Sequence, residues 1–305
     1  MIVHVTTASN NRTMTEFMAG PAQAATLAMG SMTYGELSRA RLDDLPRAAW
    51  IFSDIDLLEH RQAFSAARRW RELADRGDRL LNHPTRSMGR FELLRTLHDA
   101  GINDFDVFRA TDPRRPGRYP VFVRWIHAHS GPISTLLRDR RELDRYLARC
   151  LAEGLPRDVL MAVEHCDTRE ANGLVRQYGA FCVGRTIIPE HLWFSREWAI
   201  KAQAGWEVGD AIDREPLYAE EQRFVAENPH EAALRRIFEL ARIEYGRVDY
   251  GLRDGRIQVW EINSNPGVTI SWRARPGRDS AGLLDRFMGR FIPALSDLSG
   301  PASAG

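Results

Sequence analysis

Two acidic residues and an asparagine near the end of the chain are spaced as metal ligands would be. The segment VWEINSNPGV has the composition of a buried strand, yet Glu261 and Asn263 interrupt its apolar run, and Asp249 lies in the strand-like segment RVDYGL before it. Oxygen groups clustered on one face are costly to bury unless a hard divalent cation neutralises them. Such ligands favour Mg²⁺, whose octahedron phosphate oxygens usually complete. The pattern therefore predicts a nucleotide-bound Mg²⁺ held by Asp249, Glu261 and Asn263.

A β-hairpin must bring these side chains to one face. Side chains two residues apart along a strand lie on the same side of it. We expect Arg253-Asp254-Gly255 to form the turn between the two strands. A three-residue loop with the glycine in the left-handed conformation would pair Asp249 with Val259 and Arg247 with Glu261. We predict this register, because a two-residue loop would turn Glu261 to the opposite face. The alternative is an ion pair between Arg247 and Glu261, with asparagines that only make turns.

Composition places the chain among ordinary globular proteins. Its 305 residues are 44% hydrophobic, enough to bury a sizeable core. The 42 basic and 41 acidic residues give a net charge of +1, so no overall field attracts nucleic acid or an anionic membrane. A small-molecule or peptide partner is therefore favoured, with no nucleic acid and no membrane.

Neither secretion nor membrane spanning is expected. The first residues, MIVHVTTASNNR, lack a basic region followed by a long apolar run, and no later segment approaches the roughly eighteen apolar residues of a spanning helix. Cys150, Cys166 and Cys182 are odd in number and lack metal-ligand spacing, which is typical of reduced structural thiols. We expect a cytoplasmic protein.

Strand-like and helix-like segments alternate along the chain, which predicts a mixed α/β fold. In the first eighty or so residues, the β-rich segments 1–7 and 48–58 are followed by a helical pattern over 59–77. Further helices are expected at about 87–100 and 280–295.

The segments RVDYGL and VWEINSNPG together resemble the signature of the ATP-grasp superfamily: an acidic residue on one strand, a short turn, then Glu-x-Asn-x-Asn-Pro. They are similar to the corresponding segments of carboxylate–amine ligases such as D-alanine–D-alanine ligase. The resemblance implies ATP and two Mg²⁺ ions on Asp249, Glu261 and Asn263, with Mn²⁺ able to substitute. It also implies that Arg247 stabilises the transferring phosphoryl group and that Pro266-Gly267 lines the acceptor site.

The same resemblance implies the domain organisation. An N-terminal α/β domain would be followed by two α+β subdomains that sandwich the nucleotide, the second of which carries the metal-binding hairpin. The expected ranges are 1–83, 84–162 and 163–298, and 299–305 would form a disordered tail.

Three upstream cations match positions where the family has lysines on the phosphates. Arg90 begins an expected helix, where a cation opposes the helix dipole unless both serve a bound anion. Arg124 ends the segment YPVFVR, and arginine there keeps the charge but changes the reach. Lys201, the only lysine of the chain, matches a lysine at the terminal phosphate and would act in catalysis with Arg247. For Arg90 and Lys201 the alternative is a solvated side chain.

The segment HAHSG occupies the place of the family's phosphate-covering loop. His129 and Ser130 would donate to phosphate oxygens, although loop histidines can also simply be solvated. Glu164, at the expected hinge between subdomains, would contact the adenine amine through backbone and acid groups. Asp167 and Glu170 are both candidates for the ribose contact.

The resemblance implies transfer of the γ-phosphoryl group of ATP to a carboxylate, which gives an acyl phosphate that an amine, or less often a thiol, attacks. The expected activity is therefore an ATP-dependent C–N ligase that joins a small-molecule or peptide carboxylate to an amine. Two alternatives stay open: a phosphotransferase of the same fold, and a nucleotide-binding protein that has lost catalysis. The sequence indicates neither the substrates nor the oligomeric state, although homodimers are common among related enzymes.

Overall fold

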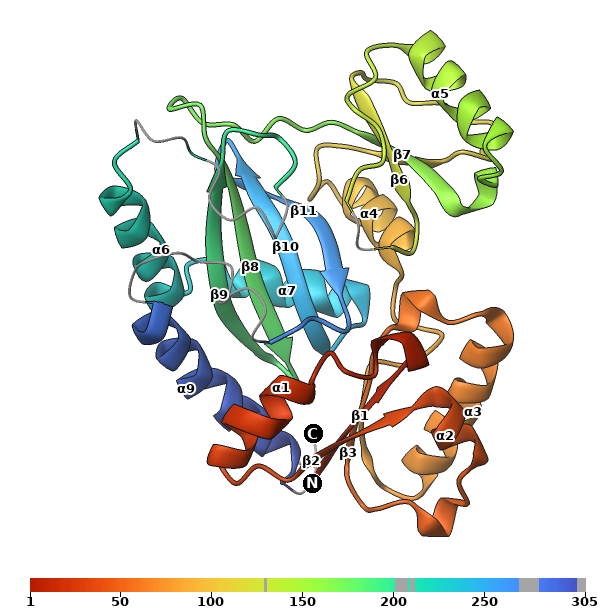
Figure 1. Ribbon diagram of the computed structural model, residues 1–305, viewed down its shortest axis with the longest axis vertical. Helices are drawn as coiled ribbons and strands as arrows, with labels where there is room; N and C mark the ends of the chain where they lie inside the picture. The colour runs from red at the N-terminus through yellow and green to blue at the C-terminus, as the bar shows by residue number, and fades with distance from the viewer. Residues whose placement is uncertain (129–130, 201–207, 209–211, 269–279, 301–305) are drawn as a thin grey trace.

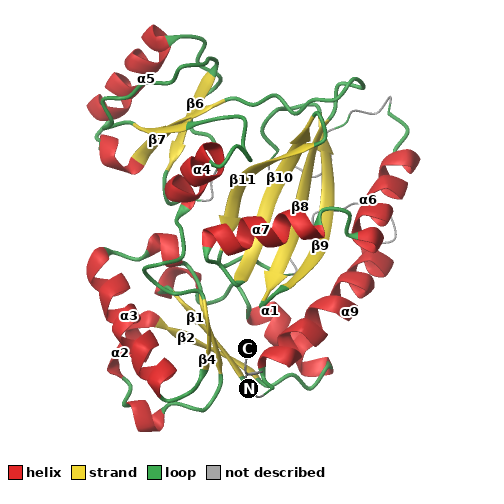
Figure 2. Ribbon diagram, turned by 180° about the vertical axis from the view of Figure 1, so that it is seen from behind, coloured by secondary structure: helices red, strands yellow, loops and turns green. Residues whose placement is uncertain are grey.

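The computed structural model describes residues 1–128, 131–200, 208, 212–268 and 280–300. Within these residues the named strands form three sheets, each covered by helices (Figures 1 and 2). The first sheet is parallel and the other two are antiparallel, so the predicted mixed α/β fold is confirmed.

The N-terminal sheet has the strand order β2-β1-β3-β4. Its strands are β1 (Ile2–Thr6), β2 (Met29–Thr33), β3 (Ala49–Phe52) and β4 (Arg79–Leu81), and its helices are α1 (Thr15–Phe17), α2 (Tyr34–Arg39) and α3 (His60–Asp75). Every residue of β1 and β3 is buried, as expected of parallel strands covered on both faces. Val3 and Val5 pack toward α2 and α3, whereas Ile2 packs toward α1.

The second sheet has the order β5-β7-β6. Its elements are α4 (Arg90–Asp99), β5 (Val107–Arg109), β6 (Val121–Trp125), α5 (Arg140–Ala152) and β7 (Leu160–Glu164). Leu143 and Leu147 of α5 pack on one face of the sheet, and Leu94 of α4 packs on the other. Because α4 also contacts β11 of the third sheet, it lies between the two sheets.

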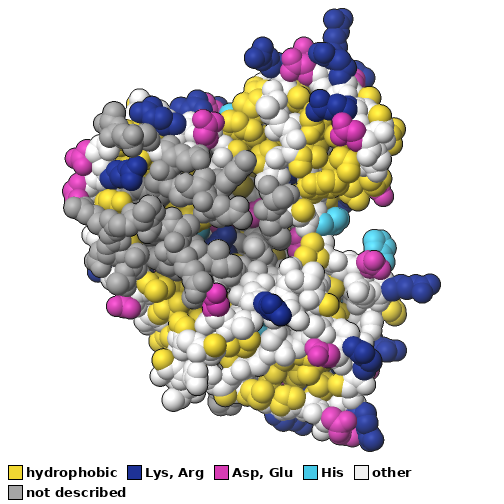
Figure 3. Space-filling view, viewed as in Figure 1, with side chains coloured by type: hydrophobic (Ala, Val, Ile, Leu, Met, Phe, Trp, Pro, Cys, Tyr) yellow, Lys and Arg dark blue, Asp and Glu magenta, His cyan; other side chains and the backbone are white. Residues whose placement is uncertain are grey.

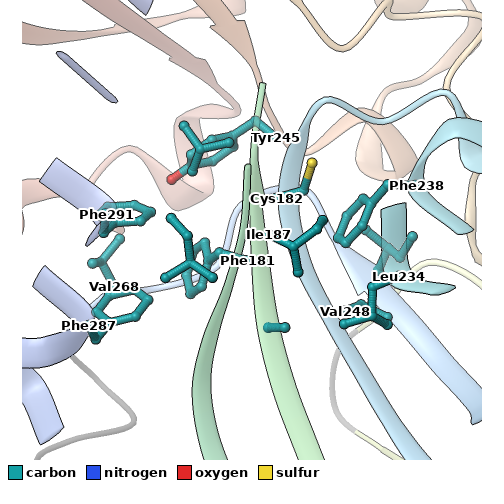
Figure 4. Close-up of a cluster of buried hydrophobic side chains, with 14 of the residues drawn as sticks. Phe181, Cys182, Ile187, Leu234, Phe238, Tyr245, Val248, Val268, Phe287 and Phe291 are labelled. Carbon is teal, nitrogen blue, oxygen red and sulfur yellow. The ribbon is translucent and has the colours of Figure 1, made fainter. Parts of the chain in front are cut away.

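The third sheet has the order β11-β10-β8-β9. Its elements are β8 (Val175–Val183), β9 (Thr186–Ser195), α6 (Glu215–Glu227), α7 (Glu231–Ala241), β10 (Tyr245–Arg253), β11 (Arg256–Asn263) and α9 (Ser280–Leu298). Figure 4 shows Leu234 and Phe238 of α7 on one face, and Phe287 and Phe291 of α9 on the other, beside Phe181. The helix α9 therefore covers one end of a sheet face whose other end carries the polar residues described below.

Asn82 joins the N-terminal sheet to the third sheet. It has the left-handed conformation (φ 62°), and its amide donates to the carbonyls of Phe52 (3.0 Å) and Tyr245 (2.8 Å). Its Oδ1 accepts from the backbone N–H groups of Glu244 and Tyr245. These bonds fix the start of β10, and thus the strand that carries Arg247, against the first sheet.

The strand β7 ends at Glu164, two residues beyond the expected limit of the central subdomain, and the expected domain ranges stay a proposal. Residues 301–305 of the expected tail lie outside the described residues. None of the helices described is both long and apolar enough to cross a membrane. On the face shown in Figure 3, basic and acidic side chains are interspersed, in keeping with the net charge of +1.

Candidate active site

The loop of the β10–β11 hairpin is shorter than predicted. The strands pair immediately on either side of Asp254-Gly255, whose φ angles of 51° and 74° are both positive. Such two-residue turns match the right-handed twist of the strands. The predicted pairing of Asp249 with Val259, and of Arg247 with Glu261, is therefore wrong.

A β-bulge nevertheless restores the predicted common face. Trp260 is an extra residue of β11, because the register shifts just after Asp249 in the facing strand. Beyond the bulge, Asp249 lies opposite Glu261 and Arg247 lies opposite Asn263. The four polar side chains that the sequence places together thus do share one face.

A pocket of about 340 Å³ lies between the second and third sheets. Its lining includes six of the predicted site residues: Arg124, Glu164, Arg247, Asp249, Glu261 and Asn263. Its apolar wall includes Phe105, Phe122, Val163, Trp193, Trp198 and Trp260. An apolar wall beside a few convergent charged groups suits a ligand with one flat aromatic part and one anionic part.

Two arginines bind Glu261. Nη2 of Arg90 and Nη2 of Arg124 both donate to its Oε2, at 2.7 and 3.0 Å. Arg90 also donates to the carbonyls of Ile126 and Ala128, which ties α4 to the end of β6. Arg90 is only 4% exposed, so the alternative of a solvated side chain is wrong for this residue. Burial lowers the pKa of Arg124 and nearby Arg90 adds to this, whereas Glu261 opposes it.

A third arginine binds Asp249. Nε and Nη2 of Arg247 donate to its two carboxylate oxygens at 2.9 and 3.2 Å. Burial and the nearby Glu261 raise the pKa of Asp249, although Arg247 opposes the rise. Burial would lower the pKa of Arg247, but Asp249 and Glu190 outweigh it and raise that pKa. The neighbouring carboxylates Asp249 and Glu261 therefore depend on cations, which guanidinium groups supply here.

The donor set fits a divalent cation. Asp249, Glu261 and Asn263 would offer a cation two carboxylates and one amide oxygen, and no group of three or more His, Cys, Asp or Glu side chains that could hold a metal is found among the described residues. The amide oxygen of Asn263 accepts from the N–H of Asn265 (2.8 Å) and keeps a second lone pair. Few ligands, all of them oxygen, suit Mg²⁺ whose remaining positions are filled by water or phosphate.

Glu164 lines the pocket, but its carboxylate is engaged elsewhere. Oε1 accepts from the N–H groups of Gly117 and Arg118, and Oε2 accepts from the N–H of Asp106 and the guanidinium of Arg118. The acid group therefore fastens the 104–118 segment to β7. Of the two expected adenine contacts, the backbone contact is the one that this geometry favours.

Several predicted residues are not brought into the pocket. Asp167 forms an ion pair with Arg169 (3.3 Å) and Glu170 forms one with Arg176 (2.7 Å), and neither acid lines the pocket. Lys201, His129 and Ser130 lie outside the described residues, so their expected roles stay predictions.

The aromatic wall and a buried polar pair are not predicted from the sequence. The ring centroids of Phe122 and Trp198 lie 5.0 Å apart. Because the two residues belong to distant segments, no local sequence pattern predicts this contact. Glu190 and His191 could have been noticed, since they interrupt the apolar run TIIPEHLWF. Both are fully buried on the strand beside the site, and Glu190 contacts Arg247.

Comparisons with solved structures identify the fold. A D-alanine–D-alanine ligase from Bacillus anthracis complexed with ATP superposes with a TM-score of 0.51 at 14% identity, covering 97% of this chain and 99% of that one. D-cycloserine synthetase DcsG superposes with a TM-score of 0.51 at 16% identity, covering 96% of this chain and 99% of that one. The ATP-grasp ligase PsnB, complexed with Mg, ADP and a variant of its precursor, superposes with a TM-score of 0.50 at 15% identity, covering 95% of this chain and 96% of that one. No family model and no curated protein sequence matches the chain.

Proposed function

We propose, on the premise that this chain has the ATP-grasp fold, that it is an ATP-dependent ligase joining a carboxylate to an amine or thiol through an acyl phosphate. One observation carries the proposal: Asp249, Glu261 and Asn263 meet the guanidinium groups of Arg124 and Arg247 at one pocket between two sheets. The solved neighbours named above are ligases, some with ATP or with Mg and ADP bound. Their likeness supports the kind of reaction and leaves the substrates open.

In this proposal the hairpin binds the metal and the arginines bind the phosphates. Bound Mg²⁺-ATP supplies the transferable phosphoryl group and the charge that neutralises the carboxylates. Asp249 and Glu261 would hold one or two Mg²⁺ ions together with Asn263, and Asp249 would then release Arg247 while Glu261 releases Arg124. Arg124 and Arg247 would turn to the phosphate oxygens, where positioned cations stabilise charge that develops during transfer.

The remaining predicted roles follow the same geometry. The aromatic wall of the pocket would hold the adenine ring, and the backbone near Glu164 would contact the adenine amine. Arg90, which already contacts the carbonyl of Ala128, lies beside the predicted phosphate-covering loop. We propose that this loop, with His129 and Ser130, and Lys201 complete the phosphate site. The carboxylate substrate would be a small molecule or a peptide.

Isothermal titration calorimetry with Mg²⁺-ATP tests this function on the wild type and on Glu261→Gln. We expect wild-type binding that requires Mg²⁺ and an affinity about 100-fold lower in the variant, equivalent to ~2.8 kcal/mol. Glu92→Gln is a matched control, because Glu92 is a largely exposed residue of α4 paired with Arg109 and should leave the affinity unchanged. Absence of Mg²⁺-dependent binding in folded wild type would refute the proposal. If binding is found, formation of an amide with release of both ADP and phosphate identifies a ligase, whereas a phosphotransferase would release ADP and leave the phosphoryl group on its acceptor.

A further inference from the structure

A second β-bulge places two consecutive polar side chains of β9 beside the proposed phosphate site. Gly179 of β8 pairs with His191, but the next residue, Ala180, pairs with Pro189, so Glu190 is the extra residue. A bulge re-aims side chains that strand alternation would send to opposite faces. Both Glu190 and His191 are 0% exposed.

These two residues reach Arg247 through a chain of hydrogen bonds. Nη1 of Arg247 donates to Oε2 of Glu190 at 3.3 Å, and Nδ1 of His191 lies 2.9 Å from the same oxygen. Oε2 of Glu190 accepts from the guanidinium, and Nδ1 of His191 donates to the same oxygen in the tautomer that carries its proton there. Because Arg247 binds Asp249 through Nε and Nη2, its guanidinium lies between two carboxylates.

The surroundings are shaped to hold the pair. A Cβ on Gly179 would lie 2.2 Å from the His191 ring, so only glycine leaves room for the imidazole. The other face of the ring stacks on Trp193, with ring centroids 4.4 Å apart. Burial lowers the pKa of His191, although the hydrogen bond and the charge of Glu190 oppose this. Replacement of buried paired charges by apolar residues of similar volume is often neutral or stabilising, so this pair is a candidate for a role other than folding.

We propose that Glu190 is a positioning residue that keeps Arg247 directed at the transferring phosphoryl group, with His191 orienting Glu190. This inference rests on the proposed function, in which Asp249 becomes a metal ligand. When Asp249 turns to Mg²⁺, Arg247 loses the two bonds that it makes in this structure. Glu190 is not among the proposed metal ligands, so its bond to Nη1 of Arg247 persists and anchors the guanidinium while Nε and Nη2 turn from Asp249 to the phosphate.

The test compares how strongly the protein distinguishes two nucleotides that differ by the terminal phosphate. Calorimetry with Mg²⁺ would give the affinities for ADP and for the non-hydrolysable ATP analogue adenylyl imidodiphosphate. In the wild type the analogue should bind more tightly. In Glu190→Gln we expect ADP affinity within about twofold of the wild type, and at least a tenfold loss of the preference for the analogue, because a misdirected Arg247 no longer meets the terminal phosphate. Glu190→Asp, which keeps the charge, should recover part of the preference.

Glu221→Gln supplies the matched control. Glu221 of α6 is 1% exposed and accepts from the N–H of Leu192, the residue after His191, so the substitution disturbs the same strand without touching Arg247. It should leave the nucleotide preference unchanged even if it lowers the melting temperature.

The possible results separate the two proposals. Wild type that binds neither nucleotide refutes the proposed function itself. If the wild type prefers the analogue and Glu190→Gln keeps the same preference, only the role of Glu190 is overturned. Equal wild-type affinity for both nucleotides overturns that role as well. If Glu190→Gln does not fold, Glu190→Asp decides: a shortened side chain that keeps the full preference contradicts the inference.

Discussion

Two buried aspartates, Asp54 in the N-terminal sheet and Asp249 in the third sheet, are held in opposite ways. Asp54 follows β3, and its carboxylate accepts from the hydroxyl groups of Thr6 (2.6 Å) and Thr7 (2.8 Å), the N–H of Thr7 and the amide of Asn10. The described contacts of Asp249 are instead with a guanidinium, and a second carboxylate, Glu261, lies opposite it.

The difference appears in the pKa of each group. Burial opposes ionisation of Asp54, but the hydrogen bonds from Thr6, Asn10 and Thr7 outweigh it and lower the pKa. At Asp249, burial and Glu261 raise the pKa. Asp54 is held by neutral hydroxyl, amide and N–H donors of the neighbouring 6–10 segment, whereas Asp249 is held by a cation, which a metal ion can replace. A buried carboxylate therefore indicates a binding site when its charge is balanced by exchangeable cations and not by fixed neutral donors.

The largest expected effect comes from Asp249→Asn. Loss of this proposed metal ligand should lower the affinity for Mg²⁺-ATP by about 100-fold, or ~2.8 kcal/mol, with a change in melting temperature of only a few degrees. Calorimetry and thermal unfolding measure the two quantities. Asp254→Asn is the control within the same hairpin, because Asp254 is exposed and asparagine tolerates its positive φ. Equal affinities of Asp249→Asn and wild type would remove Asp249 from the metal site.

Asp54→Asn should show the converse, smaller effect. The new amide would face the hydroxyl and N–H donors of Thr6 and Thr7, which we expect to lower the free energy of unfolding by about 2 kcal/mol. The left-handed conformation of residue 54 (φ 53°) suits asparagine as well as aspartate, so backbone strain does not contribute. Urea denaturation measures the loss, and Mg²⁺-ATP affinity should not change. A large loss of affinity with unchanged stability would mean that Asp54 belongs to the ligand site, and the comparison would fail.

The sequence alone predicted the mixed fold and the side chains on the hairpin face, because strand alternation and ligand chemistry are local. It did not predict how that face forms. A bulge at Trp260, not the length of the loop, aligns Asp249 with Glu261, and bulges depend on packing against neighbouring strands.

Contacts between segments far apart in the sequence were not predicted either. Arg90 and Glu261 are 171 residues apart, and only the packing of α4 against β11 brings them together. Glu164 is a similar case: its position suggested an adenine contact through backbone and acid groups, and the sequence did not show that the 104–118 segment binds both of its carboxylate oxygens. Residue type and spacing identified candidate ligands, whereas the partners that balance each charge required the fold.

The pH dependence of stability gives the smallest effect and the sharpest comparison. In metal-free protein, the contribution of Asp54, whose pKa is lowered, is present above the ordinary value of 3.8 and is lost as the pH falls through the lowered pKa. The contribution of Asp249, whose pKa is raised, has the opposite sign: it is fully present below 3.8 and is lost as the pH rises through the raised pKa. Urea denaturation between about pH 3 and pH 7 measures both differences. As the pH falls, the free energy of unfolding of the wild type should decrease relative to that of Asp54→Asn and increase relative to that of Asp249→Asn. Each slope is limited to about 1.4 kcal/mol per pH unit for one proton. Parallel slopes for the two variants would show that the two carboxylates are held alike, and the distinction between a structural and an exchangeable aspartate would have no physical basis.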